Sequence, residues 1–229
     1  MKIQKTVQYD IKNFDEHELA VSQSIFGLVP QDVYFRLDID IDLDVDKNKL
    51  FNVYGLSGEG KTILKDELYK QLSSTHYVVD YDEINIGGNI KMSELFNLEK
   101  DKDFLVKLFA SFGMFEMRNI FSRFDELSAG QQKRIKYMYL IYQAYTSADY
   151  SIGDVDCSNS VIMIDEFMTF VDSLSSKVFV QGLRKFMKKF LPNTLIFAFG
   201  CNDNIIGYWE DVTIKMQNGK ISSIIEVMK

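Results

Sequence analysis

The spacing of hydrophobic and polar side chains along the chain predicts a series of strands and helices. Residues 33–45 alternate between apolar and mostly acidic side chains, a period of two that is typical of a strand with one buried face. Short continuous apolar runs predict fully buried strands, and they occupy 50–54, 77–79, 161–164 and 195–199. Two further runs, 212–216 and 221–227, flank Asn218-Gly219, a pair that favours the type I′ turn of a β-hairpin.

Other segments repeat their apolar positions every three to four residues, which predicts helices at 62–72, 93–124, 129–145 and 175–190. The apolar stripe of the second segment includes Phe121. The expected inward face of the last segment consists of Val178, Phe179, Leu183, Phe186, Met187 and Phe190. Strands that alternate with helices predict an α/β fold with a mostly parallel sheet and antiparallel additions. We expect one domain over residues 1–229, with an inserted helical subdomain at about 90–145.

Charge and composition narrow the range of partners. The net charge of −7 and the pI near 5.0 make nucleic acid a poor partner, because its phosphates would be repelled on average. Two cysteines, Cys157 and Cys201, are too few for a disulfide scaffold. No apolar run reaches the ~20 residues of a membrane-spanning helix, and the first residues lack the pattern of a signal peptide. We therefore expect a cytoplasmic protein, with binding to the cytoplasmic face of a membrane as the peripheral alternative.

Residues 55–62, GLSGEGKT, carry the clearest chemical motif. They match the phosphate-loop pattern G-x-x-x-x-G-K-[ST], follow a predicted strand and open a predicted helix. Glycines allow successive backbone N–H groups to turn toward a phosphate, and the helix N-terminus adds partial positive charge. Lys61 is then placed for the β- and γ-phosphates, and the Thr62 hydroxyl for Mg²⁺. The nucleotide-binding residues predicted here are Gly55, Ser57, Gly58, Gly60, Lys61 and Thr62.

A second motif, LSAGQQKR at residues 127–134, begins a predicted helix. Ser128 is a good N-cap, and the small residues that follow leave the helix N-terminus open to an anion. Taken alone, the segment is explained equally well as an ordinary capped helix.

A third motif, VIMIDE at residues 161–166, ends a predicted buried strand in two carboxylates. Ligands of open α/β sheets bind at the carboxyl ends of the strands, so Asp165 is placed to hold Mg²⁺ and Glu166 to polarise an attacking water. Solvation of a strand end is the alternative explanation for the pair.

In this order, the three motifs resemble those of the ATP-binding cassette (ABC) ATPases, over about residues 33–227. The resemblance implies that the chain binds ATP and Mg²⁺, and that Glu166 is the catalytic residue that polarises the attacking water. It also implies a head-to-tail homodimer or heterodimer, in which Ser128 and Gly130 of one subunit contact the γ-phosphate bound by the other. Asp172 corresponds to the family aspartate that lies along the subunit seam.

An aromatic side chain ahead of the phosphate loop usually stacks on adenine in this family. Tyr34 is the expected candidate, while Phe26 and Phe35 are alternatives, and each of the three could instead be a core residue.

Three features differ from the family pattern. The histidine expected after the strand 195–199 is absent, because Gly200 stands there and Asn202 is the nearest substitute. The glutamine expected after 77–79 is replaced by Asp80, which we predict to be a catalytic residue and metal ligand, with Glu83 as an alternative. Phe167 follows the Asp-Glu pair in place of the common proline. Loss of the histidine predicts slow hydrolysis.

Two functions fit the resemblance. The closing hairpin and the lack of a spanning segment favour the ATPase subunit of a membrane transporter, paired with a separate membrane-spanning subunit. Phe167 and the long segment between 128 and 165 fit the alternative, a soluble ABC-type ATPase in defence, repair or complex assembly. A regulatory cassette that does not hydrolyse ATP is disfavoured, because Lys61, Asp165 and Glu166 are all present.

Overall fold

The structure is a computed structural model of the 229-residue chain. Tyr34 and Asp172, both singled out above, lie outside the residues that it describes. Those residues are 1–9, 15–26, 35–45, 49–114, 116–147, 151–152, 155–156, 159–168 and 173–227.

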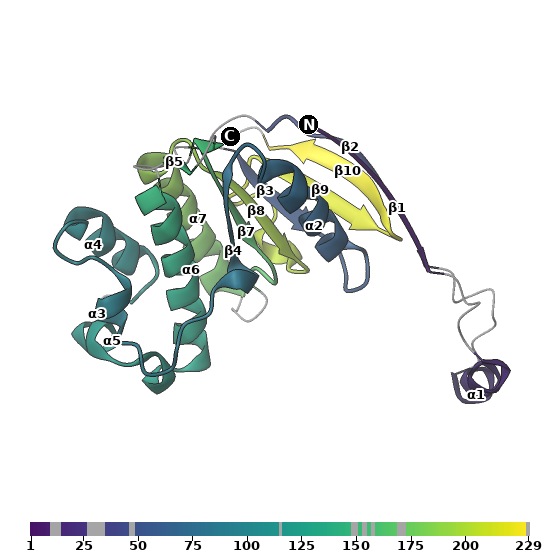
Figure 1. Cartoon of the computed structure of the whole chain (residues 1–229), viewed down its shortest axis with the longest axis horizontal. Coiled ribbons are helices and arrows are strands. Elements are labelled where there is room, and N and C mark those ends of the chain that lie inside the picture. The colour runs from purple at the N-terminus through teal and green to yellow at the C-terminus, as the bar shows by residue number, and fades with distance from the viewer. Residues whose placement is uncertain are drawn as a thin grey trace.

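Eight strands form one sheet with the order β1-β2-β10-β9-β3-β8-β7-β4 (Figure 1). The five strands from β9 to β4 are parallel, whereas β10 is antiparallel to β9 and β1 is antiparallel to β2. The predicted α/β fold with antiparallel additions is therefore confirmed. The strands are β1 (Lys2–Tyr9), β2 (Phe35–Asp42), β3 (Leu50–Tyr54), β4 (Tyr77–Asp80), β7 (Ser160–Ile164), β8 (Leu195–Gly200), β9 (Val212–Gln217) and β10 (Lys220–Glu226). A separate two-stranded ribbon pairs β5 (Ser151–Ile152) with β6 (Val155–Asp156).

Helices cover both faces of the parallel part of the sheet, which explains its continuous apolar runs. On β7, Val161 and Met163 join the hydrophobic cluster under α2 (Lys61–Leu72). The alternate residues Ile162 and Ile164 join the cluster under α6 (Ala129–Ser147) and α7 (Ser173–Phe190). All four side chains are at most 1% exposed, so neither face of this strand tolerates a polar residue.

Between β4 and the ribbon of β5 and β6 the described chain is largely helical, as predicted, but it begins with a set of short pieces before the long α6. The pieces are η3 (Tyr81–Glu83), α3 (Met92–Leu95), α4 (Lys102–Ser111), α5 (Met117–Phe121) and η4 (Phe124–Glu126). Two predictions about buried faces were wrong: the side chain of Phe121 is 57% exposed and that of Val178 is 65% exposed. Helical spacing identifies an apolar face but does not say whether a neighbouring element covers it.

The N-terminal strand and the helix that follows it were not predicted. β1 consists mostly of polar residues. Its residue Ile3 is fully buried and pairs with Ile41 of β2. The hairpin of β1 and β2 carries α1 (Glu16–Phe26), which lies apart from the sheet in Figure 1. Within the described part of the chain, no helix combines the length and apolar character needed to cross a bilayer.

The closing hairpin has the predicted turn. Asn218 and Gly219 have φ angles of 52° and 67°, and both central residues of a type I′ turn require positive φ. η5 (Asp203–Ile205) lies between β8 and this hairpin.

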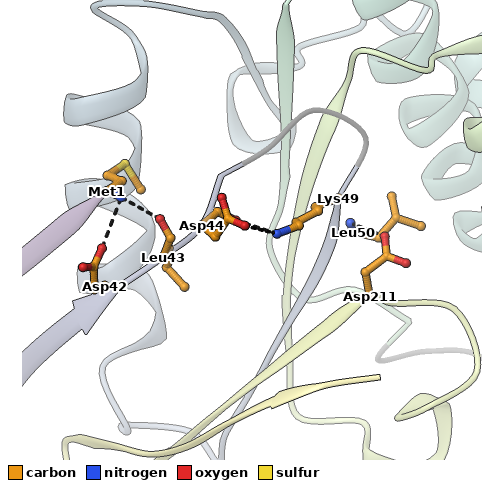
Figure 2. Close-up of polar contacts among 7 residues, drawn as sticks. All are labelled: Met1, Asp42, Leu43, Asp44, Lys49, Leu50 and Asp211. Carbon is orange, nitrogen blue, oxygen red and sulfur yellow. Dashed lines mark hydrogen bonds and ion pairs between the residues drawn. The ribbon is translucent and has the colours of Figure 1, made fainter. Parts of the chain in front are cut away.

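Asp211 ties three elements together at the opposite end of β3 from the phosphate loop. Its carboxylate accepts hydrogen bonds from Leu50 N of β3 at 3.0 Å, from Arg184 Nη2 of α7 at 2.6 Å and from Lys188 Nζ of α7 at 2.8 Å. Figure 2 shows Asp211 beside Leu50. Burial by itself raises the pKa of Asp211, but the hydrogen bonds from Lys188 and Arg184 outweigh it, so the pKa lies below its usual value.

We expect Asp211→Asn to lower the free energy of unfolding by about 1–2 kcal/mol at pH 7, because the amide loses two charge-assisted hydrogen bonds. A depressed pKa stabilises the fold above the pKa of the unfolded carboxyl, about 3.9, and this contribution is lost as the pH falls through the folded value. Urea unfolding of both proteins should therefore show a constant difference from pH 7 to pH 5 that shrinks below about pH 4.

Asp42→Asn is the matched control for this prediction. Asp42 accepts a hydrogen bond from the N-terminal amine (Figure 2), but its side chain is 80% exposed, so the substitution should change stability little. Equal effects of the two substitutions would show that Asp211 is an ordinary surface carboxylate.

Candidate functional site

Residues 55–62 form a loop between the end of β3 and the start of α2. Gly58 and Gly60 have φ angles of 84° and 88°, which L-residues with a Cβ rarely adopt, so both glycines are required by the backbone. Lys61 Nζ donates hydrogen bonds to Gly55 O and Leu56 O, both at 2.8 Å. The lysine side chain is thus folded back along the loop that it belongs to.

Two contacts fix the loop to neighbouring strands. Gly55 N donates to Gly200 O at the end of β8 at 3.2 Å. A Cβ on Gly55 would lie 3.1 Å from Met216 O, closer than most real Cβ contacts, so a larger residue there would require the strand β9 to shift slightly. Glu59 Oε2 accepts a hydrogen bond from Gly219 N at 3.0 Å, which joins the loop to the turn of the β9–β10 hairpin. This link was not predicted, because the two residues lie 160 positions apart in the chain.

The two carboxylates after β7 lie at the same edge of the sheet as the loop. Asp165 Oδ1 accepts a hydrogen bond from Glu166 N at 2.8 Å, and Glu166 has a φ of 50°. Positive φ is uncommon for a residue other than glycine and is found preferentially at functional sites. Glu166 also lies near Tyr81 and Tyr137. Burial first, and then the negative charges of Asp82 and Glu166, raise the pKa of Tyr81. Burial is also the largest cause of the raised pKa of Tyr137, with smaller contributions from Tyr81 and Glu166.

A cavity of about 420 Å³ joins the loop and the carboxylates, a size in the range of small-molecule sites. The predicted residues Ser57, Gly58, Gly60, Lys61 and Thr62 meet the predicted Asp165 and Glu166 there. The described residues that line it are Ser57, Gly58, Gly60, Lys61, Thr62, Ile63, Asp165, Glu166, Gly200 and Cys201.

The residues of this cavity fit a triphosphate and Mg²⁺. One wall offers an ammonium group on Lys61 and the N-terminus of the 12-residue helix α2, both of which favour an anion. The Thr62 hydroxyl and the Asp165 carboxylate are oxygen ligands of the kind that Mg²⁺ prefers. No described residue lies within 4 Å of a Cβ built on Gly58, so the described chain leaves room for a ligand beside this part of the backbone.

Asp80 is placed differently from these residues. It lies at the carboxyl end of β4, but its side chain is 8% exposed and pairs with Lys65 Nζ at 3.1 Å. Its Oδ1 also accepts a hydrogen bond from Asp82 N at 3.1 Å, and Lys65 pairs with Asp82 as well. Burial lowers the pKa of Lys65, but the hydrogen bonds that Lys65 donates to Asp82 and Asp80 outweigh this effect and raise the pKa. Asp80 is not among the described residues that line the cavity, so these contacts favour a structural role, and metal binding by Asp80 stays a prediction.

The strand end that lacks the expected histidine is closely packed. A Cβ on Gly200 would lie 3.0 Å from Phe167 O, closer than most real contacts of a Cβ. Phe167 N in turn donates to Phe199 O at 2.9 Å, which holds the two segments together. Asn202 is engaged elsewhere: its Nδ2 donates to Met168 O at 3.1 Å and its Oδ1 caps η5. Cys201, which the sequence analysis did not select, is the exposed residue that lines the cavity here.

The second motif opens α6 with a reciprocal cap. Ser128 N donates to Gln131 Oε1 at 2.9 Å, and Gln131 N donates to Ser128 Oγ at 3.4 Å. Ser128, Ala129 and Gly130 are all exposed. Gly130 lines a second cavity, between α4, α6 and α7, and neither Ser128 nor Gly130 is among the described residues that line the first. Within one chain, the second motif therefore does not complete the site that the other two form.

The candidates for adenine stacking cannot be placed from the structure. Tyr34 lies outside the described residues, and Phe26 and Phe35 belong to α1 and β2 without a described side-chain position. Phe167, by contrast, is a core residue: its ring lies 5.0 Å from that of the fully buried Trp209.

Comparison with solved structures identifies similar folds. The chain aligns over 100% of its length, and 100% of the other chain, with the dimeric structure of MJ0796, a bacterial ABC transporter cassette, at a TM-score of 0.61 and 15% identity. It aligns with CbiO1 of Clostridium perfringens, part of the ABC transporter complex CbiONQ, at a TM-score of 0.59 and 13% identity, over 98% of this chain and 87% of the other. A structure described as a putative metal-chelate type ABC transporter matches at a TM-score of 0.56 and 14% identity, over 86% of this chain and 79% of the other. No protein-family model and no curated protein matches the chain.

Proposed function

We propose that this chain, which has the fold of the ABC ATPase cassettes, binds ATP with Mg²⁺ and hydrolyses the bond between its β- and γ-phosphates. The observation that carries the proposal is the single cavity in which the loop 55–62 meets Asp165 and Glu166. A phosphate-binding loop and a carboxylate pair at the same edge of a parallel sheet are the parts that phosphoryl transfer to water requires.

Each residue has a distinct part in this proposal. The backbone N–H groups of the loop and Lys61 Nζ hold the phosphates, and Lys61 must leave the carbonyl oxygens of Gly55 and Leu56 to do so. Thr62 and Asp165 would hold Mg²⁺, which supplies charge neutralisation at the phosphates when bound. Glu166 accepts a hydrogen bond from the attacking water and orients it, as an exposed carboxylate at the mouth of the cavity can do.

A second cassette is needed to close the site. Ser128 and Gly130 are exposed and lie away from the cavity of their own chain, so the anion that they could contact belongs to another subunit. One similar structure, MJ0796, is described as dimeric, and another structure of it is described as a post-hydrolysis state bound to ADP and Pi. We propose the same head-to-tail arrangement for this chain, with either a second copy or a different cassette as the partner.

The role that we propose for the ATPase is that of a transporter subunit at the cytoplasmic face of a membrane. The similar solved structures named above are described as ABC transporter cassettes and complexes, and a separate subunit would have to span the membrane. The soluble alternative rests on Phe167 after the Asp-Glu pair and on the long segment between 128 and 165, which contains the ribbon of β5 and β6.

Titration calorimetry with ATP and Mg²⁺, followed by a phosphate-release assay, tests the proposal. We expect saturable binding at one nucleotide per chain and slow release of phosphate. No heat of binding at millimolar ATP would contradict the nucleotide site. Co-purification with a membrane protein from detergent extracts would support the transporter role, whereas stimulation of the ATPase by DNA or RNA would favour the soluble alternative.

A further inference from the structure

The turn 166–168, which follows Asp165, has an unusual backbone. Glu166 and Met168 have φ angles of 50° and 58°, and among the other described residues besides glycine only Asn218 of the closing hairpin shares a positive φ. A residue with a Cβ is strained in this conformation, which persists only where the surrounding structure holds it. Glu166 orients the attacking water in the proposed function, so the contacts that hold this turn also set the position of its carboxylate.

Asn202 makes one of these contacts. Its Nδ2 donates a hydrogen bond to Met168 O at 3.1 Å, and its Oδ1 accepts one from Asn204 N at 3.1 Å, which caps η5. η5 is itself fixed in the core, since its residue Ile205 is 1% exposed. The amide of Asn202 therefore connects a fixed element to the turn, and both of its ends are used within the chain.

Tyr137 of α6 makes a second contact with the same residue. Its side chain is buried, and its ring lies 6.0 Å from that of Phe167. A backbone hydrogen bond with Met168 lowers the pKa of Tyr137 and so partly opposes the effect of burial. A hydrogen bond has this effect when it is donated to the phenol oxygen, so the Met168 N–H is the donor. Both backbone polar groups of Met168 are thus bonded to side chains, one from α6 and one from the segment after β8.

We propose that Asn202 and Tyr137 are positioning residues for hydrolysis. Together they clamp Met168, which keeps Glu166 in the left-handed conformation that places its carboxylate at the cavity. The proposal rests on the proposed function and deepens it, because it adds two residues that act through Glu166. Phe167, in the middle of the turn, is fixed by its main-chain bond to β8 and by core packing, so the clamp supplies the restraint at the far end. Without the clamp, Met168 returns to a negative φ and the carboxylate moves with the turn.

Steady-state kinetics of Asn202→Asp and Tyr137→Phe provide the first test. The aspartate keeps the oxygen that caps η5 but places a second oxygen against Met168 O, and the phenylalanine removes only a hydroxyl. Each substitution should lower kcat by about 10-fold to 100-fold and leave the Kd for ATP, measured by titration calorimetry, within about 2-fold, because the phosphate loop is unchanged. Tyr145→Phe, which removes a hydroxyl from the same helix on a ring stacked against Phe104, should keep the wild-type kcat.

A double-mutant cycle with Glu166→Gln separates positioning from a general loss of stability. If the clamp acts through Glu166, adding Asn202→Asp to Glu166→Gln should change the residual kcat by less than about 2-fold. A folding defect would instead lower the rate by the same factor in both backgrounds, and thermal unfolding of each variant measures such a defect directly.

Crystal structures of Asn202→Asp and Tyr137→Phe without nucleotide test the backbone part of the inference independently of activity. In each variant, Met168 and Glu166 should leave the region of positive φ. A turn that keeps both angles in both variants would overturn the clamp.

The kinetic outcomes are equally decisive. Wild-type kcat in both variants, or a further loss by the same factor in the Glu166→Gln background, would overturn the inference. A rise in the Kd for ATP that matches the loss of kcat would also overturn it, because Asn202 would then contact the nucleotide itself. The proposed function fails in a different way, since the unsubstituted chain would then bind no ATP.

Discussion

Replacing Lys61 with alanine is expected to weaken the binding of ATP by at least about 100-fold, equivalent to roughly 3 kcal/mol. Lys61 supplies the one ammonium group among the described residues that line the cavity, so its loss leaves the phosphates with backbone N–H groups alone. The effect should be measured by titration calorimetry with ATP and Mg²⁺.

Two controls make this result interpretable. Lys70→Ala removes an exposed lysine near the end of the same helix and should leave ATP affinity unchanged. Thermal unfolding of Lys61→Ala without nucleotide should resemble the wild type, since the hydrogen bonds of Lys61 to Gly55 O and Leu56 O are partly exposed. An unchanged affinity of Lys61→Ala for ATP would show that the loop 55–62 is not part of the nucleotide site.

Glu166→Gln is expected to keep ATP binding while lowering kcat by about 100-fold to 1,000-fold. Glutamine has nearly the same shape as glutamate, but its neutral amide cannot accept a proton from the attacking water as the carboxylate can. Because hydrolysis is the step that would reopen the dimer, this variant should accumulate ATP-dependent dimers, which light scattering can measure.

The comparison for Glu166→Gln is Asp203→Asn, which removes an exposed carboxylate in η5 a short distance along the chain from Cys201. It should hydrolyse ATP at the wild-type rate. If Glu166→Gln also turned over at the wild-type rate, another group would have to orient the water, and the positive φ of Glu166 would need a different explanation.

Much of the sheet could be predicted because its central strands are buried on both faces. A run such as 161–164 has few structural explanations other than a covered strand. β1 was missed for the opposite reason: it lies at the edge of the sheet, and most of its residues are polar. Among the described side chains of β1 only Ile3 is fully buried, and one such position gives no periodicity by itself.

The candidate site was predictable where chain order determines geometry. Carboxyl ends of parallel strands meet at one edge of a sheet, so residues 55–62 and Asp165 had to lie close together once β3 and β7 were identified. Asp80 shows the limit of this reasoning. Its pairing with Lys65 depends on how α2 is rotated about its axis as it packs on the sheet. Neither the sequence of α2 nor that of β4 predicts this rotation.

The close fit of Gly200 against Phe167 O links two stretches of sequence that otherwise have no reason to vary together. A side chain at position 200 can be accommodated only if the turn after Asp165 moves, and the same turn sets the backbone angle of Glu166. Natural variants of this chain should therefore change 166–168 and 200 as a set. An engineer who wishes to install a histidine at position 200 must redesign that turn as well.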